Sequence, residues 1–369
     1  MNPITLFLVF IVLLGPLMLV HELGHFLAAK RAGVRVEEFG MGLPPRAVKL
    51  AQRGDTTYSL NWLPFGAFVR MTGENPDDAH DDPRSFSAAS KFWRAVIIFA
   101  GPLANFLSAV VILFFAYLVL AEQPTAVRYR IDSVRDGSPA QAIGFKQGDV
   151  VLSVNGVDML EKLAGDGAAI EPTHLRDQAR ASVGKEFTAI VQRKDGAATS
   201  EITLKGAIPA NADATAPLGV SLGFPVVSSA RDNNTVPQAA SMAFDDLATM
   251  LKGMARLPGD LISGRMTLEQ ARPVGPVGIT MIGASLLQQG LFAFVRFAGI
   301  LSFLIGLSNL LPIPALDGGR LVFIFIEAIR GRRVDPAREQ WVHAVGMIFV
   351  LALAVVIVVM DLVKPVVLP

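Results

Sequence analysis

The dominant pattern along the chain is a set of four long apolar runs separated by polar segments. The runs extend over residues 1–20, 95–121, 297–316 and 344–360. Each is long and uncharged enough to cross about 30 Å of hydrocarbon, which takes roughly 20 helical residues. The pattern therefore predicts a polytopic α-helical membrane protein with four transmembrane helices.

Two uncharged segments need separate interpretation. The first run has no basic residue ahead of it and no small-residue cleavage pattern after it, so we expect a retained span and not a cleaved signal peptide. Residues 278–295 are also uncharged, but they include two Gln and three Gly residues. We expect this segment to lie at the membrane surface; if it crossed, the last two spans would reverse their direction.

Basic residues are concentrated in two of the connections between spans. Ten Lys or Arg residues lie between the first and second spans, and five Arg residues lie between the third and fourth. By the positive-inside bias, both connections face the cytoplasm. The N-terminus, the long segment 122–296 and the C-terminal tail are then outside.

Composition narrows the function classes. The 33 basic and 32 acidic side chains leave a formal net charge of +1, so the chain has no electrostatic footprint for nucleic acid. Apolar residues make up 52% and charged residues 18%, against roughly 25% charged in soluble domains. The sequence contains no Cys, so any metal site must use His, Asp or Glu.

The first apolar run ends in the motif His21-Glu22-Leu23-Gly24-His25. Two His residues four apart project from one helix face and can reach one metal ion, while Glu22 lies beside them as a candidate general base. Polar side chains at the end of an apolar helix are costly to insert, about 2.5 to 3.5 kcal/mol per charge, which favours a functional role. This is the arrangement of zinc hydrolases.

A catalytic zinc site uses three protein ligands and an open position for water. Asp317 is our candidate for the third ligand, because it follows an irregular Pro- and Gly-containing stretch at the end of the third run. The alternative is a helix break with a solvated Asp at the interface. For the other histidines, His80, His174 and His343, we expect surface or interface roles.

Zinc bound by these residues would activate water for attack on a carbonyl, with Glu22 taking the proton. The predicted reaction is hydrolysis of a peptide bond. Two alternatives are a zinc-bound scaffold without catalysis, which would not need Glu22, and a transporter. The absence of a repeat between the two halves of the chain argues against a transporter.

These motifs resemble the site-two protease family of intramembrane zinc metalloproteases, and most closely the bacterial regulator-of-sigma-E protease type. The motif around His21 is joined by Gly101-Pro102-Leu103-Ala104-Asn105 in the second span and by the stretch from Asn309 to Gly319. The resemblance implies Zn²⁺ on His21, His25 and Asp317, with Glu22 catalytic. It also implies that Asn309 holds the substrate backbone near the metal, and we add Pro312 and Pro314 to the predicted substrate-binding residues.

The same resemblance gives a meaning to two further segments. A membrane-associated β-hairpin is expected between Phe39 and Val69, where it can pair with an unwound substrate by strand addition; an ordinary cytoplasmic hairpin is the alternative. In segment 122–225, residues 129–134, 149–154, 186–193 and 201–204 are strand-like and 173–183 helical. The segment resembles one bacterial PDZ domain of α+β type, acting as a filter for substrates or as a spacer.

These inferences divide the chain into seven parts. We predict the first transmembrane helix with the zinc motif at 1–30, the hairpin loop at 31–91, the second transmembrane helix at 92–121, the PDZ domain at 122–225, an amphipathic segment at 226–295, the third transmembrane helix with the Asp ligand at 296–330, and the fourth at 340–363.

The expected activity is cleavage of the transmembrane segment of single-span proteins after a first external cut. By resemblance, the substrates are membrane anti-sigma factors and remnant signal peptides. We expect a multi-pass monomer in the lipid bilayer of the bacterial inner membrane, with a periplasmic PDZ domain and an active site toward the cytoplasmic side.

Overall fold

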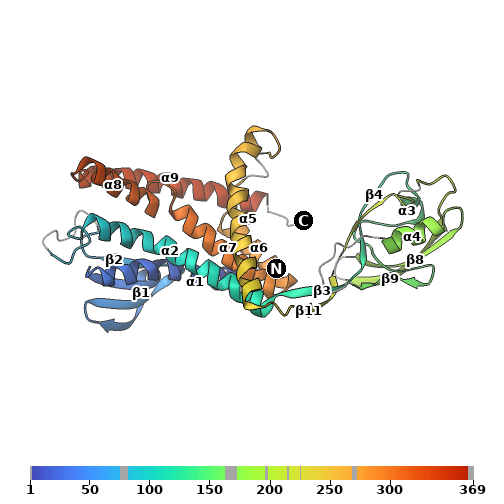
Figure 1. Cartoon of the computed structure of the whole chain (residues 1–369), viewed down its shortest axis with the longest axis horizontal. Helices are drawn as coiled ribbons and strands as arrows, with labels where there is room; N and C mark the ends of the chain where they lie inside the picture. The colour runs from blue at the N-terminus through green and yellow to red at the C-terminus, as the bar shows by residue number, and fades with distance from the viewer. Residues whose placement is uncertain are drawn as a thin grey trace. The chain divides into compact units, whose positions relative to one another are not determined.

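The computed structural model describes residues 2–74, 82–162, 173–195, 198–213, 216–224, 226–267 and 272–364. It divides into two compact units. The first comprises Met1–Leu120 together with Asn234–Pro369, and the second comprises Ala121–Asn233. The first unit is mostly helical and the second mostly strand, and both are drawn in Figure 1.

The first unit contains one hairpin and seven helical segments in its described part. They are α1 (Pro3–Arg31), β1 (Val36–Arg53), β2 (Thr56–Met71), α2 (Lys91–Phe115) with its π-helical continuation η1 (Ala116–Leu120), α5 (Val236–Ile262), α6 (Pro276–Gln289), α7 (Leu291–Asn309), α8 (Asp317–Arg330) and α9 (Pro336–Val363). Among the described residues, four helices are long and apolar enough to cross a membrane: Pro3–Arg31, Lys91–Leu120, Leu291–Asn309 and Ala337–Val363. The prediction of four apolar helices long enough to span is therefore confirmed.

The third span ends earlier than its apolar run suggests. Helix α7 stops at Asn309, and α8 begins a separate helix at Asp317. The third transmembrane helix predicted at 296–330 is therefore two helices, and its apolar run stops being helical before residue 316, because Pro312 and Pro314 in the predicted irregular stretch lack the N–H groups that a continuing helix requires. Asp317 thus lies at the start of a helix, directly after an irregular loop.

Helix α6 covers most of the uncharged segment whose location was ambiguous. It has 14 residues, fewer than a spanning helix needs. Its Ala284 belongs to a buried apolar cluster with Val9 and Leu13 of α1, and Gly283 faces the same two residues. The segment therefore packs against the apolar part of the first span, which differs from the surface position expected for it.

Small residues allow the spanning helices to approach one another closely. A Cβ atom on Gly24 of α1 would overlap the carbonyl of Ala100 in α2. On α7, a Cβ on Gly299 would lie 2.7 Å from Leu113 and one on Gly306 would lie 2.9 Å from the Pro102 carbonyl, both in α2. Close packing of this kind stabilises helix association inside a bilayer, where the hydrophobic effect between helices is absent.

The hairpin of β1 and β2 folds back on itself. Phe39 lies opposite both Tyr58 and Val69, so the first part of β1 is flanked by both halves of β2. Phe26 at the end of α1 contacts the rings of Phe39 and Tyr58, with centroids 5.1 and 6.0 Å apart. These aromatic contacts fix the hairpin beside the end of α1 that carries the His motif.

The second unit is a small α+β domain. Its larger sheet has the order β10-β4-β5-β8-β9, with β6 paired to β5, and its smaller sheet has the order β11-β3-β7. The strands and helices are β3 (Glu122–Val127), β4 (Tyr129–Val134), α3 (Pro139–Ile143), β5 (Val150–Val154), β6 (Val157–Asp158), β7 (Glu161–Lys162), α4 (Thr173–Ala181), β8 (Glu186–Asp195), β9 (Ala198–Ala207), β10 (Val220–Gly223) and β11 (Val226–Arg231). Strands β4, β5, β8 and β9 and helix α4 correspond to the elements predicted from the sequence.

Candidate metal centre and catalytic cavity

Two imidazoles from helix α1 form one half of the candidate site. His21 and His25 are four residues apart and therefore project from one face of the helix, and both are 8% exposed. Their Nε2 atoms are 3.2 Å apart, and their rings meet edge to face. Two buried polar rings in an apolar helix call for a partner that binds both.

Asp317 supplies the other half from the far end of the sequence. It is the first residue of α8 and directly follows the irregular loop after α7. Its Oδ2 atom lies 3.1 Å from Nε2 of His21 and 3.4 Å from Nε2 of His25. The structure thus brings together the three residues that the sequence selected as candidate ligands.

The three atoms have the spacing that a zinc ion requires. Bonds of 2.0–2.1 Å in a tetrahedron place neighbouring ligand atoms about 3.3 Å apart. The observed separations are 3.1, 3.2 and 3.4 Å. Apart from the two imidazoles, no donor reaches the buried Oδ2 of Asp317 within the part of the chain that the structure describes. The residues present therefore fit a zinc site.

Helix α2 orients the imidazoles. Nδ1 of His25 donates to the backbone carbonyl of Ile97 at 2.8 Å, so its Nε2 carries the lone pair that a metal needs. Gly101, one turn further along α2, leaves space for both rings. A Cβ atom there would overlap Nε2 of His25 and lie 2.9 Å from Nε2 of His21. The sequence marked Gly101 only as part of a motif in the second span. Its position shows that it leaves space for the two imidazoles.

A cavity of about 290 Å³ opens beside the three candidate ligands. Glu22 and Asn309 line it, as does the last part of β2 through Phe68, Val69 and Met71. Asn309 ends α7 and donates from its side-chain amide to the Ile305 carbonyl at 3.0 Å. The cavity thus combines the ligands, a carboxylate, an amide and a strand.

The remaining predicted substrate residues lie elsewhere in the site. Pro312 and Pro314 belong to the loop between α7 and α8 and are not among the residues that line the cavity. Their effect is to interrupt the helix between α7 and α8, because neither has a backbone N–H that could donate a helical hydrogen bond.

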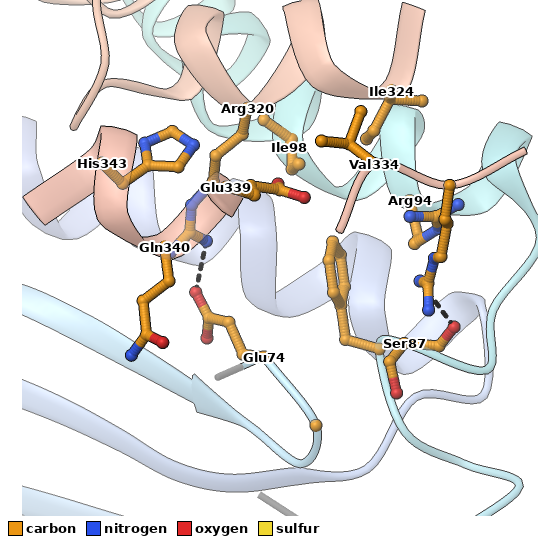
Figure 2. Close-up of a pocket in the computed structure, with 13 residues that line it drawn as sticks. Glu74, Ser87, Arg94, Ile98, Arg320, Ile324, Val334, Glu339, Gln340 and His343 are labelled. Atoms are coloured by element: carbon orange, nitrogen blue, oxygen red, sulfur yellow. Dashed lines mark hydrogen bonds and ion pairs between the residues drawn. The ribbon is translucent and has the colours of Figure 1, made fainter. Parts of the chain in front are cut away.

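A second cavity, of about 170 Å³, adjoins the first and shares Glu74, Ile98 and Arg320 with it. Figure 2 shows the ion pair between Arg320 of α8 and Glu74, which follows β2. Arg320 lies one turn after Asp317, so this pair connects the hairpin segment to the helix that carries the candidate ligand.

Two interactions near the site were not predicted from the sequence. Arg94 of α2 forms a buried ion pair with Glu327 of α8, in which its Nη2 atom donates to both carboxylate oxygens at 2.8 and 2.7 Å. His343 of α9 accepts a hydrogen bond from the backbone N–H of Ala315. The residues in each pair are far apart in sequence, so no local pattern marks them as partners.

His174 pairs with a carboxylate of the second unit. Nδ1 of His174, on α4, lies 3.2 Å from Oε2 of Glu161 in an exposed position. His80 lies outside the described residues.

Comparison with known proteins identifies the family. The sequence model of peptidase family M50 matches residues 9–353. The chain belongs to peptidase family M50. It is also similar to two proteins named zinc metalloprotease RasP. The protein of Geobacillus kaustophilus is 27% identical over 96% of this chain and 97% of its own length, and that of Shouchella clausii is 29% identical over 97% and 98%.

Membership of this family establishes the activity class. The M50 chain is a membrane-embedded zinc metalloprotease of the site-two protease type, and its cofactor is Zn²⁺. The four apolar helices and the family agree on a polytopic membrane protein.

Proposed function

We propose that His21, His25 and Asp317 hold the catalytic zinc ion and that Glu22 is the general base. The observation that carries the proposal is the convergence of the three ligand atoms to within 3.4 Å of one another. Bound zinc supplies a Lewis acid that polarises the scissile carbonyl and lowers the pKa of water to about 7.

Glu22 has the position that proton transfer requires. It follows His21 in the helix, so it lies beside the ligand pair without sharing their face, and it lines the same cavity. In the proposed reaction its carboxylate takes a proton from the attacking water and passes it to the nitrogen of the leaving amine. The peptide bond is then broken, with one new carboxyl and one new amino terminus.

The substrate is a transmembrane segment that unwinds before it is cut. A helix hides its carbonyls in its own hydrogen bonds, so attack requires an extended stretch whose freed backbone groups find partners. Phe68, Val69 and Met71 of β2 border the cavity, which supports strand addition at this edge as the way those groups are satisfied. Asn309 is the candidate for holding the substrate carbonyl near the zinc.

The second unit acts in this proposal as a PDZ-type peptide-binding domain. A groove of about 100 Å³ lies between α4 and β10, lined by apolar residues such as Leu175, Leu218 and Val220. Strand β10 is at the end of the sheet order, so it offers an edge for an added strand. Its role is to admit single-span substrates already shortened outside the membrane, with anti-sigma factors and remnant signal peptides as the substrate classes.

The orientation follows from charge. The connections rich in Lys and Arg face the cytoplasm, which puts the active site toward that side of a bacterial inner membrane and the PDZ-type unit in the periplasm.

The test uses Glu22→Gln and Asp317→Ala in purified, zinc-loaded protein. Glu22→Gln is expected to keep its zinc and to abolish cleavage of a model transmembrane substrate, and Asp317→Ala is expected to lose zinc. A scaffold without catalysis would show no cleavage by the unmodified chain. Turnover by Glu22→Gln would remove Glu22 as the base, and normal zinc content in Asp317→Ala would move the third ligand elsewhere.

A further inference from the structure

The loop before Asp317 is held by a side chain from another helix. Backbone N–H groups at Ile313 and Leu316 bond within the loop, to the carbonyls of Leu311 and Ile313. The N–H of Ala315 instead donates to Nδ1 of His343 on α9, at 3.0 Å. This bond joins the loop to α9, since His343 lies 28 residues after Ala315 in the sequence.

Ala315 is under backbone strain that the bond can offset. Its φ of +83° lies in the left-handed region that a residue with a Cβ rarely adopts. Such conformations persist where surrounding contacts fix them, and they cluster at functional sites. Ala315 is two residues before the candidate ligand, so a change in its conformation would move Asp317.

A second contact from α9 reaches the neighbouring loop residue. Gly346 lies three residues after His343, on the same face of α9. A Cβ atom at Gly346 would overlap Pro314 and lie 2.7 Å from its carbonyl oxygen. One face of α9 therefore contacts Pro314 through Gly346 and Ala315 through His343.

The ring of His343 is itself oriented by packing. It lies against Phe323 of α8, with ring centroids 5.4 Å apart and planes 50° apart. Figure 2 shows it beside the Arg320 side chain, at the second cavity. Since Nδ1 accepts from a backbone N–H, the ring is neutral with its proton on Nε2.

We propose that His343 is a positioning residue for the zinc site: by accepting the Ala315 N–H, it holds the loop so that Asp317 reaches both imidazoles. The inference rests on the proposed function, because it takes Asp317 as the third ligand. His343 touches neither substrate nor metal in this role. Partners behind metal ligands typically change metal affinity by about 10- to 100-fold when removed.

The experiment compares His343→Leu with His343→Asn in the full-length protein. Leu removes the acceptor, whereas the Oδ1 atom of Asn is the closest replacement for Nδ1. Zinc retention is measured against a chelator, and kcat and KM are measured with a model transmembrane substrate. Met347→Leu, one turn along α9 at a residue 46% exposed, is the control for a change on the same helix.

His343→Leu is expected to hold zinc about 10- to 100-fold less tightly, with lower kcat and little change in KM. His343→Asn is expected to recover most of that loss, and Met347→Leu to match the unmodified chain. Equal defects in the Leu and Asn variants would overturn the inference, because ring packing and not the acceptor would then matter.

Asp317→Ala separates this inference from the proposed function. If it keeps its zinc, the ligand assignment fails; if it loses zinc while His343→Leu retains it, only the role of His343 fails. Should His343→Leu not fold, Gly346→Ala tests the same face of α9 against Pro314. Unchanged zinc retention in that folded variant would overturn the inference.

Discussion

Replacing Gly101 by Ala is the smallest change that tests the geometry of the metal centre. It adds one methyl group to α2 that would overlap Nε2 of His25 and lie 2.9 Å from Nε2 of His21. The ring of His25 has little freedom to withdraw, because its Nδ1 is bonded to the Ile97 carbonyl. The methyl group and the two imidazole nitrogens therefore compete for one space.

The size of the effect follows from the distances. The added Cβ would lie 2.9 Å from Nε2 of His21, whereas an ordinary contact is about 3.5 Å or longer. The ring of His21 must therefore move by about 0.6 Å. This is about three times the roughly 0.2 Å that zinc–ligand distances tolerate. Overpacking of this kind costs about 1–3 kcal/mol, which corresponds to zinc binding weakened by about 5- to 150-fold.

Competition with a chelator measures this change, together with the rate of cleavage. Gly15→Ala is the matched control, since Gly15 lies in α1 and a Cβ there would meet nothing within 4 Å. Both substitutions raise helix propensity equally, so only the contact with the imidazoles differs. Zinc affinity and turnover in Gly101→Ala that match those of Gly15→Ala would refute this account of the site.

Two further predictions concern the surroundings of the site. Glu327→Gln removes the charge that pairs with the buried Arg94 guanidinium, so we expect about 3–5 kcal/mol lower stability and a lower unfolding temperature. The control is Arg338→Gln, at a side chain 84% exposed, which should change neither. An unaltered unfolding temperature in Glu327→Gln would contradict the role of the pair. Replacing Ala121–Asn233 by a short linker should preserve zinc binding, because the two ends of this unit lie close together, with the N–H of Asp232 donating to the carbonyl of Ala121 at 2.8 Å. The same change should relax discrimination against untrimmed substrates. Unaltered selectivity would make the unit a spacer.

Features with a local cause could be predicted from the sequence. The spacing of His21 and His25 puts both rings on one helix face, and the four apolar runs specify four spanning helices because bilayer thickness sets their length. Asp317 could be selected because polar residues and irregular backbone at membrane depth are costly without a use. The bounds of the third span were wrong because apolar character continues on both sides of the prolines that separate α7 from α8.

What the sequence did not reveal depends on how distant helices meet. The space beside Gly101 exists only once α1 and α2 have a definite register, and the Arg94–Glu327 pair joins residues 233 positions apart. His343 was assigned a surface or interface role, and its particular partner could not be found because a backbone N–H has no signature in a sequence. Such contacts arise from tertiary packing, and no periodicity in one helix encodes them.

Helix α8 shows how these contacts combine to direct Asp317. Asp317, Arg320 and Glu327 are separated by three and seven residues, so at 3.6 residues per turn they lie within about 80° on one face. Each is engaged by a different segment: the imidazoles of α1, Glu74 after β2 and Arg94 of α2. The apolar residues Phe325 and Ile329 are 65% and 70% exposed, as expected for a face in contact with lipid. Charged side chains of a membrane protein pair with one another away from lipid, so the two ion pairs fix the rotation of the helix whose first residue lies beside the two imidazoles.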